Sequence, residues 1–244
     1  MLTVLTLLKL KPSPDGARHG ERAFWREWGQ AYLDKWISSV LRYVPGWKRI
    51  IVMTDAPEQI VLRYTTPSEA TFRVAILDST IGAPGFWAKL EMFRHGVGKS
   101  LYLDLDNVIR GPLDELCALT PDPLIMLDDR RVPGLPNGSM ILFDADRCRG
   151  IWEHYTKRPR QYERDFRPVG ADFGRAYDQA FIAEYLDESG HEVSFFQSLL
   201  PPSYILNARS ELPNVTDLAA TRVLFGGGAE GKPHLSPHPA FSLA

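Results

Sequence analysis

The sequence predicts an α/β protein with a central, largely parallel (mixed) β-sheet flanked by helices. Short apolar runs alternate along the chain with segments whose apolar residues recur at helical spacing. This alternation is typical of βαβ units. In the middle of the chain, the run LYLDL is almost continuously apolar, as expected for a strand covered on both faces of a parallel sheet. Together the two patterns favour one doubly covered sheet.

The elements follow from local patterns in chain order. Leu2–Leu8 is an apolar run that predicts the first strand. The spacing of Trp25, Trp28, Tyr32, Trp36 and Val40 predicts a helix from about Glu21 to Val44, which could begin only after Gly29. The same reasoning predicts strands at Arg49–Met53, Val74–Leu77, Leu101–Leu105, Leu124–Leu127 and Ser139–Phe143, and helices ahead of Gly96, after Gly111, from about Asp146 and over Tyr177–Leu186.

Composition limits the class of protein. The chain has 244 residues, 44% of them hydrophobic and 24% charged, with a formal net charge of −2. This length can bury a sizeable core, and we expect a single domain over residues 1–244, with a Gly/Pro-rich loop and tail from about residue 226. A charge close to zero argues against nucleic acid as a partner.

The expected location is the cytoplasm. Cys117 and Cys148 could pair, but two thiols in a chain of this size favour a reducing compartment. The first apolar run is too short for a membrane span and has no basic region before it, so a first strand fits it better than a signal peptide. Between Arg147 and Arg167, arginines stand among aromatic residues. A solvated helix face explains that segment best, and membrane contact is at most peripheral.

Asp104 and Asp106 interrupt the central apolar run. Side chains alternate along a strand, so we expect both carboxylates on the same side of the sheet. They would lie near the carboxyl end of a parallel strand, where α/β proteins bind ligands. Burying two unpaired carboxylates together is costly, and a divalent metal is the simplest cation to balance them.

Three motifs follow downstream. Pro136–Ser139 (PNGS) could bring backbone amides close to a ligand, but a plain turn explains Asn-Gly better. Asp178 and Gln179 open a helix, where an acidic first turn complements the macrodipole. The run FGGGAEGKPH from Phe225 could wrap a diphosphate with its lysine, or form a simple C-terminal loop.

Taken in order, these segments resemble glycosyltransferase family 8, the glycogenin- and galactosyltransferase-like group. The resemblance is carried by the first strand, LYLDLD, PNGSMILF, DQAFIAEYL, a Tyr204–Asn207 segment and a Gly-rich turn ending in Lys-Pro. The stretches WGQAY, VPGWKRIIVMTD and WAKLEMF look like counterparts in compact bacterial relatives. The resemblance extends from Leu2 to about His234.

This resemblance implies a GT-A fold and transfer of a sugar from a nucleotide-diphosphate sugar, most often a UDP-sugar, with retention. The acceptor would be a glycan, a lipid-linked sugar or a protein. Asp104 and Asp106, the DXD motif, would hold Mn²⁺ or Mg²⁺, and Asp178 and Gln179 would act at the reacting centre. The implied donor-binding residues are Thr6, Tyr32, Asp55, Lys89, Asp104, Asn137, Gly138, Ser139, Asn207 and Lys232.

The sequence departs from the family at one metal ligand. The family places a histidine about six residues before the Lys-Pro pair, where this chain has Gly226, or Phe225 with a shift of one residue. Neither side chain can ligate a metal, and His234 after Lys-Pro is the nearest substitute. A nucleotide-sugar-binding protein without turnover is therefore an alternative to an enzyme.

A second alternative is a haloacid-dehalogenase-like phosphatase. LYLDLDNVI also resembles the signature in which the first aspartate, here Asp104, is the nucleophile and the second is a general acid/base. In those proteins the motif usually sits on the first strand, whereas about a hundred residues precede it here. Asp128 and Asp129 also follow too soon to form their distal metal site. The transferase is the favoured hypothesis.

Overall fold

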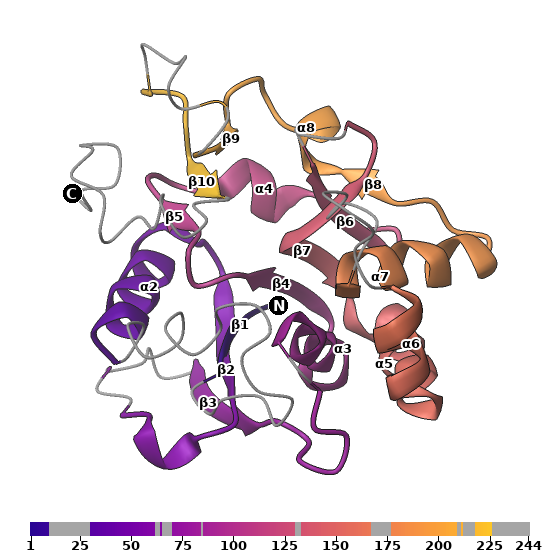
Figure 1. The fold of residues 1–244 in the computed structure, drawn as a ribbon. Helices are drawn as coiled ribbons and strands as arrows, with labels where there is room; N and C mark the ends of the chain where they lie inside the picture. Colours follow the sequence, from indigo (N-terminus) through magenta and orange to yellow (C-terminus); the bar gives the residue numbers. More distant parts are fainter. Residues whose placement is uncertain are drawn as a thin grey trace.

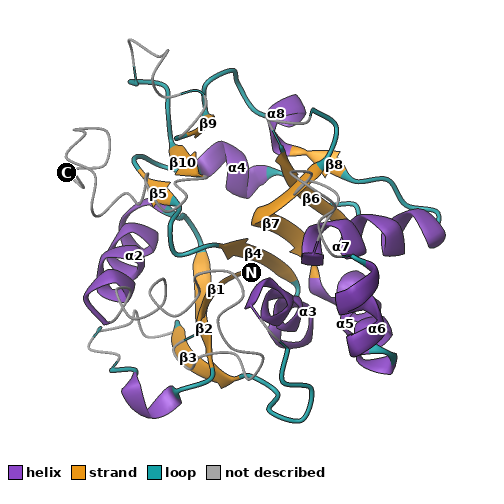
Figure 2. Ribbon diagram, in the orientation of Figure 1, coloured by secondary structure: helices purple, strands orange, loops and turns teal. Residues whose placement is uncertain are grey.

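The structure, a computed structural model, describes residues 1–9, 30–61, 64, 70–83, 85–129, 133–166, 177–208, 211 and 218–225. It confirms the α/β prediction: helices lie on both sides of a twisted central sheet (Figures 1 and 2). Within these residues, no helix is long and apolar enough to cross a membrane.

Seven strands form the main sheet. In spatial order they are β3 (Thr71–Ile76), β2 (Trp47–Thr54), β1 (Leu2–Leu8), β4 (Lys99–Leu103), β7 (Pro136–Asp144), β6 (Leu124–Asp128) and β8 (Ser194–Phe195). The pairs β2–β3, β1–β2, β1–β4 and β6–β8 are parallel, whereas β7 runs antiparallel to both β4 and β6. The sheet is therefore largely parallel and mixed, as predicted.

Alternation along the strands divides the core into two layers. In β4, Leu101 and Leu103 point into one apolar cluster, and Tyr102 points into the other. The first layer is covered by α2 (Gln30–Tyr43), α4 (Asp114–Ala118) and α8 (Phe196–Leu199); the second is covered by η2 (Gly85–Glu91), α3 (Met92–His95), α5 (Ala145–Lys157) and α7 (Tyr177–Glu188). Side chains that follow Tyr102 with a period of two thus face η2 and α7.

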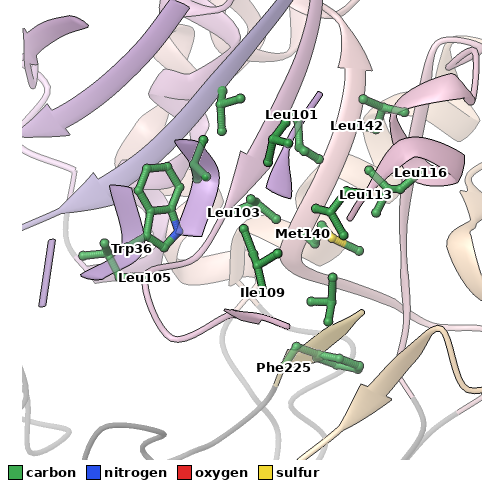
Figure 3. Packing of buried hydrophobic residues seen from close by; sticks show 14 of the residues in the cluster. Trp36, Leu101, Leu103, Leu105, Ile109, Leu113, Leu116, Met140, Leu142 and Phe225 are labelled. Atoms are coloured by element: carbon green, nitrogen blue, oxygen red, sulfur yellow. The ribbon is translucent and has the colours of Figure 1, made fainter. Parts of the chain in front are cut away.

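A small second sheet lies beside the end of β4. It contains β5 (Val108–Ile109), β10 (Val223–Phe225) and β9 (Ile205–Asn207), with β10 antiparallel to β5 and parallel to β9. Leu105, Ile109 and Phe225 belong to the same apolar cluster as Leu103 and are seen together in Figure 3. The chain that follows β4 is therefore anchored in the core from both sheets.

Local chemistry explains where one predicted helix starts. The Asp144 carboxylate accepts hydrogen bonds from the backbone amides of Asp146 and Arg147, at 3.0 and 3.2 Å. This is an N-cap, so α5 begins at Ala145 rather than slightly later. The shorter helices η1 (Pro57–Gln59) and α6 (Pro159–Asp165) both start with a proline, which is preorganised for the first helical position.

Two local predictions need correction, and two concern residues outside the described part of the chain. Pro136–Ser139 is not a turn but the first part of β7, paired irregularly with the end of β6. β4 ends at Leu103, and Leu105 belongs to a turn after it. Helix α2 is described from Gln30, whereas Glu21–Gly29 and the predicted tail from residue 226 lie outside the described residues.

Leu103→Ala should lower the free energy of unfolding by about 2–5 kcal/mol, because it removes a fully buried side chain beneath the turn after β4. Urea denaturation followed by circular dichroism measures this loss. Val97→Ala is the control: Val97 is 38% exposed, so the change should stay within about 0.5 kcal/mol. Equal losses in both variants would show that the core beneath the turn is not packed as described.

Candidate functional site

The site lies where the strand order of the sheet reverses. The strands that follow β1 along one side of the sheet are β2 and β3, and β4 pairs with its other side. In open α/β sheets, ligands bind at such a reversal, outside the carboxyl ends of the strands. Asp104 directly follows the carboxyl end of β4, so it stands at this position.

Asp104 and Asp106 lie on a tight turn after β4. The Asn107 backbone amide donates to the Asp104 carbonyl oxygen at 3.0 Å, which closes the turn. The Asp104 amide donates to the Ser139 carbonyl oxygen at 2.8 Å, and the Asn107 side-chain amide donates to the same oxygen at 2.7 Å. β4 ends at Leu103, before both aspartates, so strand alternation does not by itself place the two carboxylates on one side. The charges of Asp104 and Asp106 nevertheless both act on Lys89.

Lys89 supplies the cation that Asp104 requires. Its Nζ atom, on η2, lies 2.7 Å from Asp104 Oδ2, and the Lys89 side chain is only 9% exposed. The hydroxyl of fully buried Tyr102 donates to the other carboxylate oxygen, Oδ1, at 2.6 Å. Both oxygens of Asp104 thus have partners in the described structure, one of them charged.

The charge on Lys89 is stabilised by several carboxylates. Burial by itself would lower the pKa of the Lys89 ammonium, but the charges of Asp104, Asp178 and Asp106 outweigh burial and raise it. Lys89 is therefore protonated, and it links Asp104 to Asp178 electrostatically. The same carboxylates, together with burial as the larger cause, raise the pKa of Tyr102, which stays a neutral donor.

Asp178, in the first turn of α7, is buried next to this pair. Within the described residues, its Oδ2 atom has no hydrogen-bond partner. A Cβ atom on Gly138 would lie only 3.0 Å from that oxygen, so β7 approaches the carboxylate closely at a glycine. The Gly138 amide donates to Gln179 Oε1 at 3.2 Å, which fixes the start of α7 against β7.

The residue before Asp178 has a rarely populated backbone conformation. Tyr177 has a φ of 62°, in the left-handed region that side chains other than glycine and asparagine seldom adopt. Its amide donates to the Phe166 carbonyl oxygen at 2.7 Å, and its ring lies 5.2 Å from the Phe86 ring. These contacts hold the strained residue, and strain of this kind is concentrated at functional sites.

The other predicted site residues are distributed as follows. Tyr32 is a buried residue of α2. Burial first, and then the charge of Asp106, raises the pKa of the Tyr32 phenol. Asn137 accepts a hydrogen bond from the Ser139 amide at 3.0 Å. Thr6 is buried in β1, Asp55 directly follows β2, and Asn207 ends β9. That any of these residues contacts a nucleotide stays a prediction.

The donor set for a metal is incomplete in the described part of the chain, where no three His, Cys, Asp or Glu side chains gather as a metal site. Phe225 is buried in β10 and cannot ligate a metal. Gly226, Lys232 and His234 lie outside the described residues. Asp104 and Asp106 have the chemistry that Mg²⁺ uses, since it is often held by one or two carboxylates plus substrate phosphates. Both Asp104 oxygens already accept hydrogen bonds from Lys89 and Tyr102, so a metal would have to share these oxygens, and the metal site stays a prediction.

Two contributors to this site were missed in the sequence. Tyr102 precedes Asp104 by two residues, so the period of a strand places both on one face, and this signal was available. Asn107 gave no such signal, because its partner Ser139 is 32 residues away on a neighbouring strand. Both residues hold the Asp104 turn in place.

Comparison with known proteins gives information on the fold. No family model and no curated protein matches the sequence. Among solved structures, the chain is similar to the glycosyltransferase GlyE of Streptococcus pneumoniae TIGR4, with a TM-score of 0.63 and 12% identity over 98% of this chain. The apo form of GlyE gives a TM-score of 0.60 and 13% identity over 97% of the chain.

The chain has a glycosyltransferase-like fold. It spans 57% and 56% of the length of the two GlyE structures. A central sheet that is parallel except for β7 fits the predicted GT-A-type arrangement. At 12–13% identity the likeness concerns the fold alone.

Asp178→Asn should change how stability depends on pH. Burial, more than the neighbouring Asp104, raises the Asp178 pKa to about 6, although Lys89 opposes this. The folded protein thus binds a proton that the unfolded chain releases near pH ~4, so this group lowers stability as pH rises from ~4 to ~6. The variant should gain roughly 2 kcal/mol relative to wild type between these pH values.

Chemical denaturation of wild type and variant at several pH values measures this gain. Asp187→Asn, which neutralises an exposed carboxylate on the same helix, is the matched control and should show no such gain. A stability difference between wild type and Asp178→Asn that does not change with pH would contradict the described burial of Asp178.

Proposed function

We propose that the protein is a metal-assisted, retaining glycosyltransferase of family 8 type that uses a nucleotide-diphosphate sugar, with a UDP-sugar as the proposed donor. One observation carries the proposal: the buried Asp178 carboxylate, with one oxygen that has no partner among the described residues, lies beside the Lys89–Asp104 ion pair. The pair stands at the carboxyl end of β4 in a glycosyltransferase-like fold. The acceptor would be a glycan, a lipid-linked sugar or a protein.

The diphosphate side of the proposed site is formed by Lys89, Asp104 and Asp106. Asp104 and Asp106 would hold Mn²⁺ or Mg²⁺, which would neutralise charge developing on the departing nucleotide diphosphate. The Lys89 ammonium, kept charged by the surrounding carboxylates, would contribute a second positive charge there. Tyr102 and Asn107 would keep the turn in the position that this binding needs.

The sugar and acceptor side is formed by α7 and β7. Within the part of the chain that the structure describes, Asp178 Oδ2 has no hydrogen-bond partner, so it is suited to accept a hydrogen bond from an acceptor hydroxyl or to stabilise positive charge at the anomeric carbon. Gln179 would act beside it at the reacting centre. Asn137, Gly138 and Ser139 would lie beneath the donor sugar, because β7 passes next to Asp178 there. Thr6, Tyr32, Asp55, Asn207 and Lys232 are the remaining proposed donor contacts.

The two alternatives differ in what they predict. The likeness in fold is to glycosyltransferases, which supports the transferase over a phosphatase with Asp104 as nucleophile. A nucleotide-sugar-binding protein would share every donor contact and lack only transfer. Wild-type protein that binds a UDP-sugar but transfers it to no acceptor, and does not hydrolyse it, would select this alternative.

Asp106→Ala should abolish Mn²⁺-dependent donor binding and leave the fold intact, because Asp106 lies on the turn and supplies one of the two proposed metal ligands. Calorimetric titration of UDP and GDP, with and without Mn²⁺, measures binding, and circular dichroism checks the fold. Glu115→Ala removes an exposed carboxylate of α4 and should bind as wild type does. Undiminished Mn²⁺-dependent binding in Asp106→Ala would refute the metal assignment.

Asp178→Ala should slow sugar transfer by about a hundredfold or more, as expected for the loss of a group that acts in the transition state. Donor affinity should change by no more than roughly threefold, because the proposed diphosphate contacts lie on Lys89, Asp104 and Asp106. Initial rates of donor turnover and calorimetric donor affinity, measured on one preparation, separate the two effects. Equal losses in both quantities would remove Asp178 from the reacting centre.

A further inference from the structure

A hollow lies among α5, α6 and α7, away from the proposed transfer site. It has a volume of about 220 Å³. Its walls are formed by His154 from α5, Tyr162 from α6, and Phe181, Glu184, Tyr185 and Glu188 from α7. The four α7 residues have helical spacing, so they share one face of the helix. Figure 1 shows the three helices side by side at the edge of the molecule. None of the six residues belongs to the proposed transfer site.

Aromatic rings form most of this hollow. The Tyr162 and Phe181 ring centroids are 4.9 Å apart, and the His154 ring lies 5.3 Å from both Tyr162 and Tyr185. The Tyr162 hydroxyl is hydrogen-bonded to His154 Nε2 at 2.7 Å. The rings therefore support one another, and the hollow is formed before any ligand binds.

A glycine in the middle of α5 lets Tyr185 take its place in the wall. A Cβ atom at Gly150 would lie 2.3 Å from the Tyr185 hydroxyl, so any larger residue would displace that ring. A glycine in a helix interior costs about 1 kcal/mol relative to alanine. In this helix the glycine allows the close approach of Tyr185.

Among the described residues that line the hollow, the charges have one sign. Glu184 and Glu188 are four residues apart on α7, where like charges repel each other. Partial burial first, and then the charges of Glu188 and Asp165, raise the pKa of Glu184. No lysine or arginine is among the six lining residues. On α6, Arg160 is paired instead with Glu163, at 2.9 Å.

From these contacts we propose that the hollow binds an organic ammonium group, carried either by a small diamine or by a lysine side chain. A cation is attracted by the faces of aromatic rings and by both carboxylates, and it would relieve the repulsion between Glu184 and Glu188. Both carboxylates would repel an anion, and a neutral ligand would leave the two charges uncompensated. This proposal does not depend on the transfer reaction.

The test is a ligand titration followed by saturation-transfer NMR at about pH 8, where ordinary carboxylates are ionised and ordinary imidazoles neutral. Putrescine represents the free diamine, N-acetyl-lysine methylamide represents the lysine side chain, and butanediol is the neutral counterpart of putrescine. We expect at least one ammonium probe to bind saturably and butanediol to bind at least tenfold more weakly. Whichever ammonium probe binds more tightly shows whether the ammonium group comes from a free diamine or from a lysine side chain.

Three variants of the full chain locate the binding. Glu184→Gln with Glu188→Gln keeps the shape and removes the charge, so affinity should fall at least tenfold. Gly150→Ala should also weaken binding by displacing Tyr185. Asp187→Asn removes an exposed carboxylate on the same helix that does not line the hollow, and it should bind as wild type does. Equal binding of putrescine and butanediol, or unchanged ammonium binding in the double variant, would overturn the proposal.

Discussion

The contact between Lys89 and Asp104 is the interaction on which the site depends. At 2.7 Å, and with the lysine side chain 9% exposed, each charge needs the other, because an isolated buried charge costs several kcal/mol. The ion pair joins η2 to the end of β4, two segments that the sheet brings together at the reversal of its strand order. Tyr102 then fixes the remaining carboxylate oxygen. Removing the Lys89 charge would therefore leave Asp104 without a positively charged partner among the described residues.

At Asp178 the effect of burial is larger than that of the neighbouring positive charge, whereas at Lys89 the neighbouring charges outweigh burial. Lys89 is near enough to lower the pKa of Asp178, yet burial dominates and raises that pKa to about 6. One oxygen has no partner among the described residues, and the preceding Tyr177 has a strained backbone. If this position served only the stability of the fold, an apolar residue in place of Asp178 would be more stable. Costs of this kind are usual where a polar group has to meet a substrate.

Apolar patterning was sufficient to predict the α/β class and most strands, since burial of short apolar runs decides where strands form. The boundaries at the site were not predictable in the same way. Asp106 falls in a turn because the Asp104 amide pairs with Ser139, and Pro136–Ser139 is extended because β7 pairs with β6 and β4. Both depend on contacts between distant segments. The sequence pattern predicted that Asp178 belongs to the site. It could not predict that the carboxylate is buried, or that one of its oxygens has no partner among the described residues.

The most direct test of the account is a crystal structure of the protein with Mn²⁺ and UDP, with anomalous scattering used to locate the metal. The account predicts Mn²⁺ bound by Asp104 and Asp106, the diphosphate next to Lys89, and Asp178 facing the position of the donor sugar. A metal or nucleotide bound elsewhere, with the Lys89–Asp104–Tyr102 contacts unchanged, would contradict it. The ion pair would then be only a structural feature of the sheet.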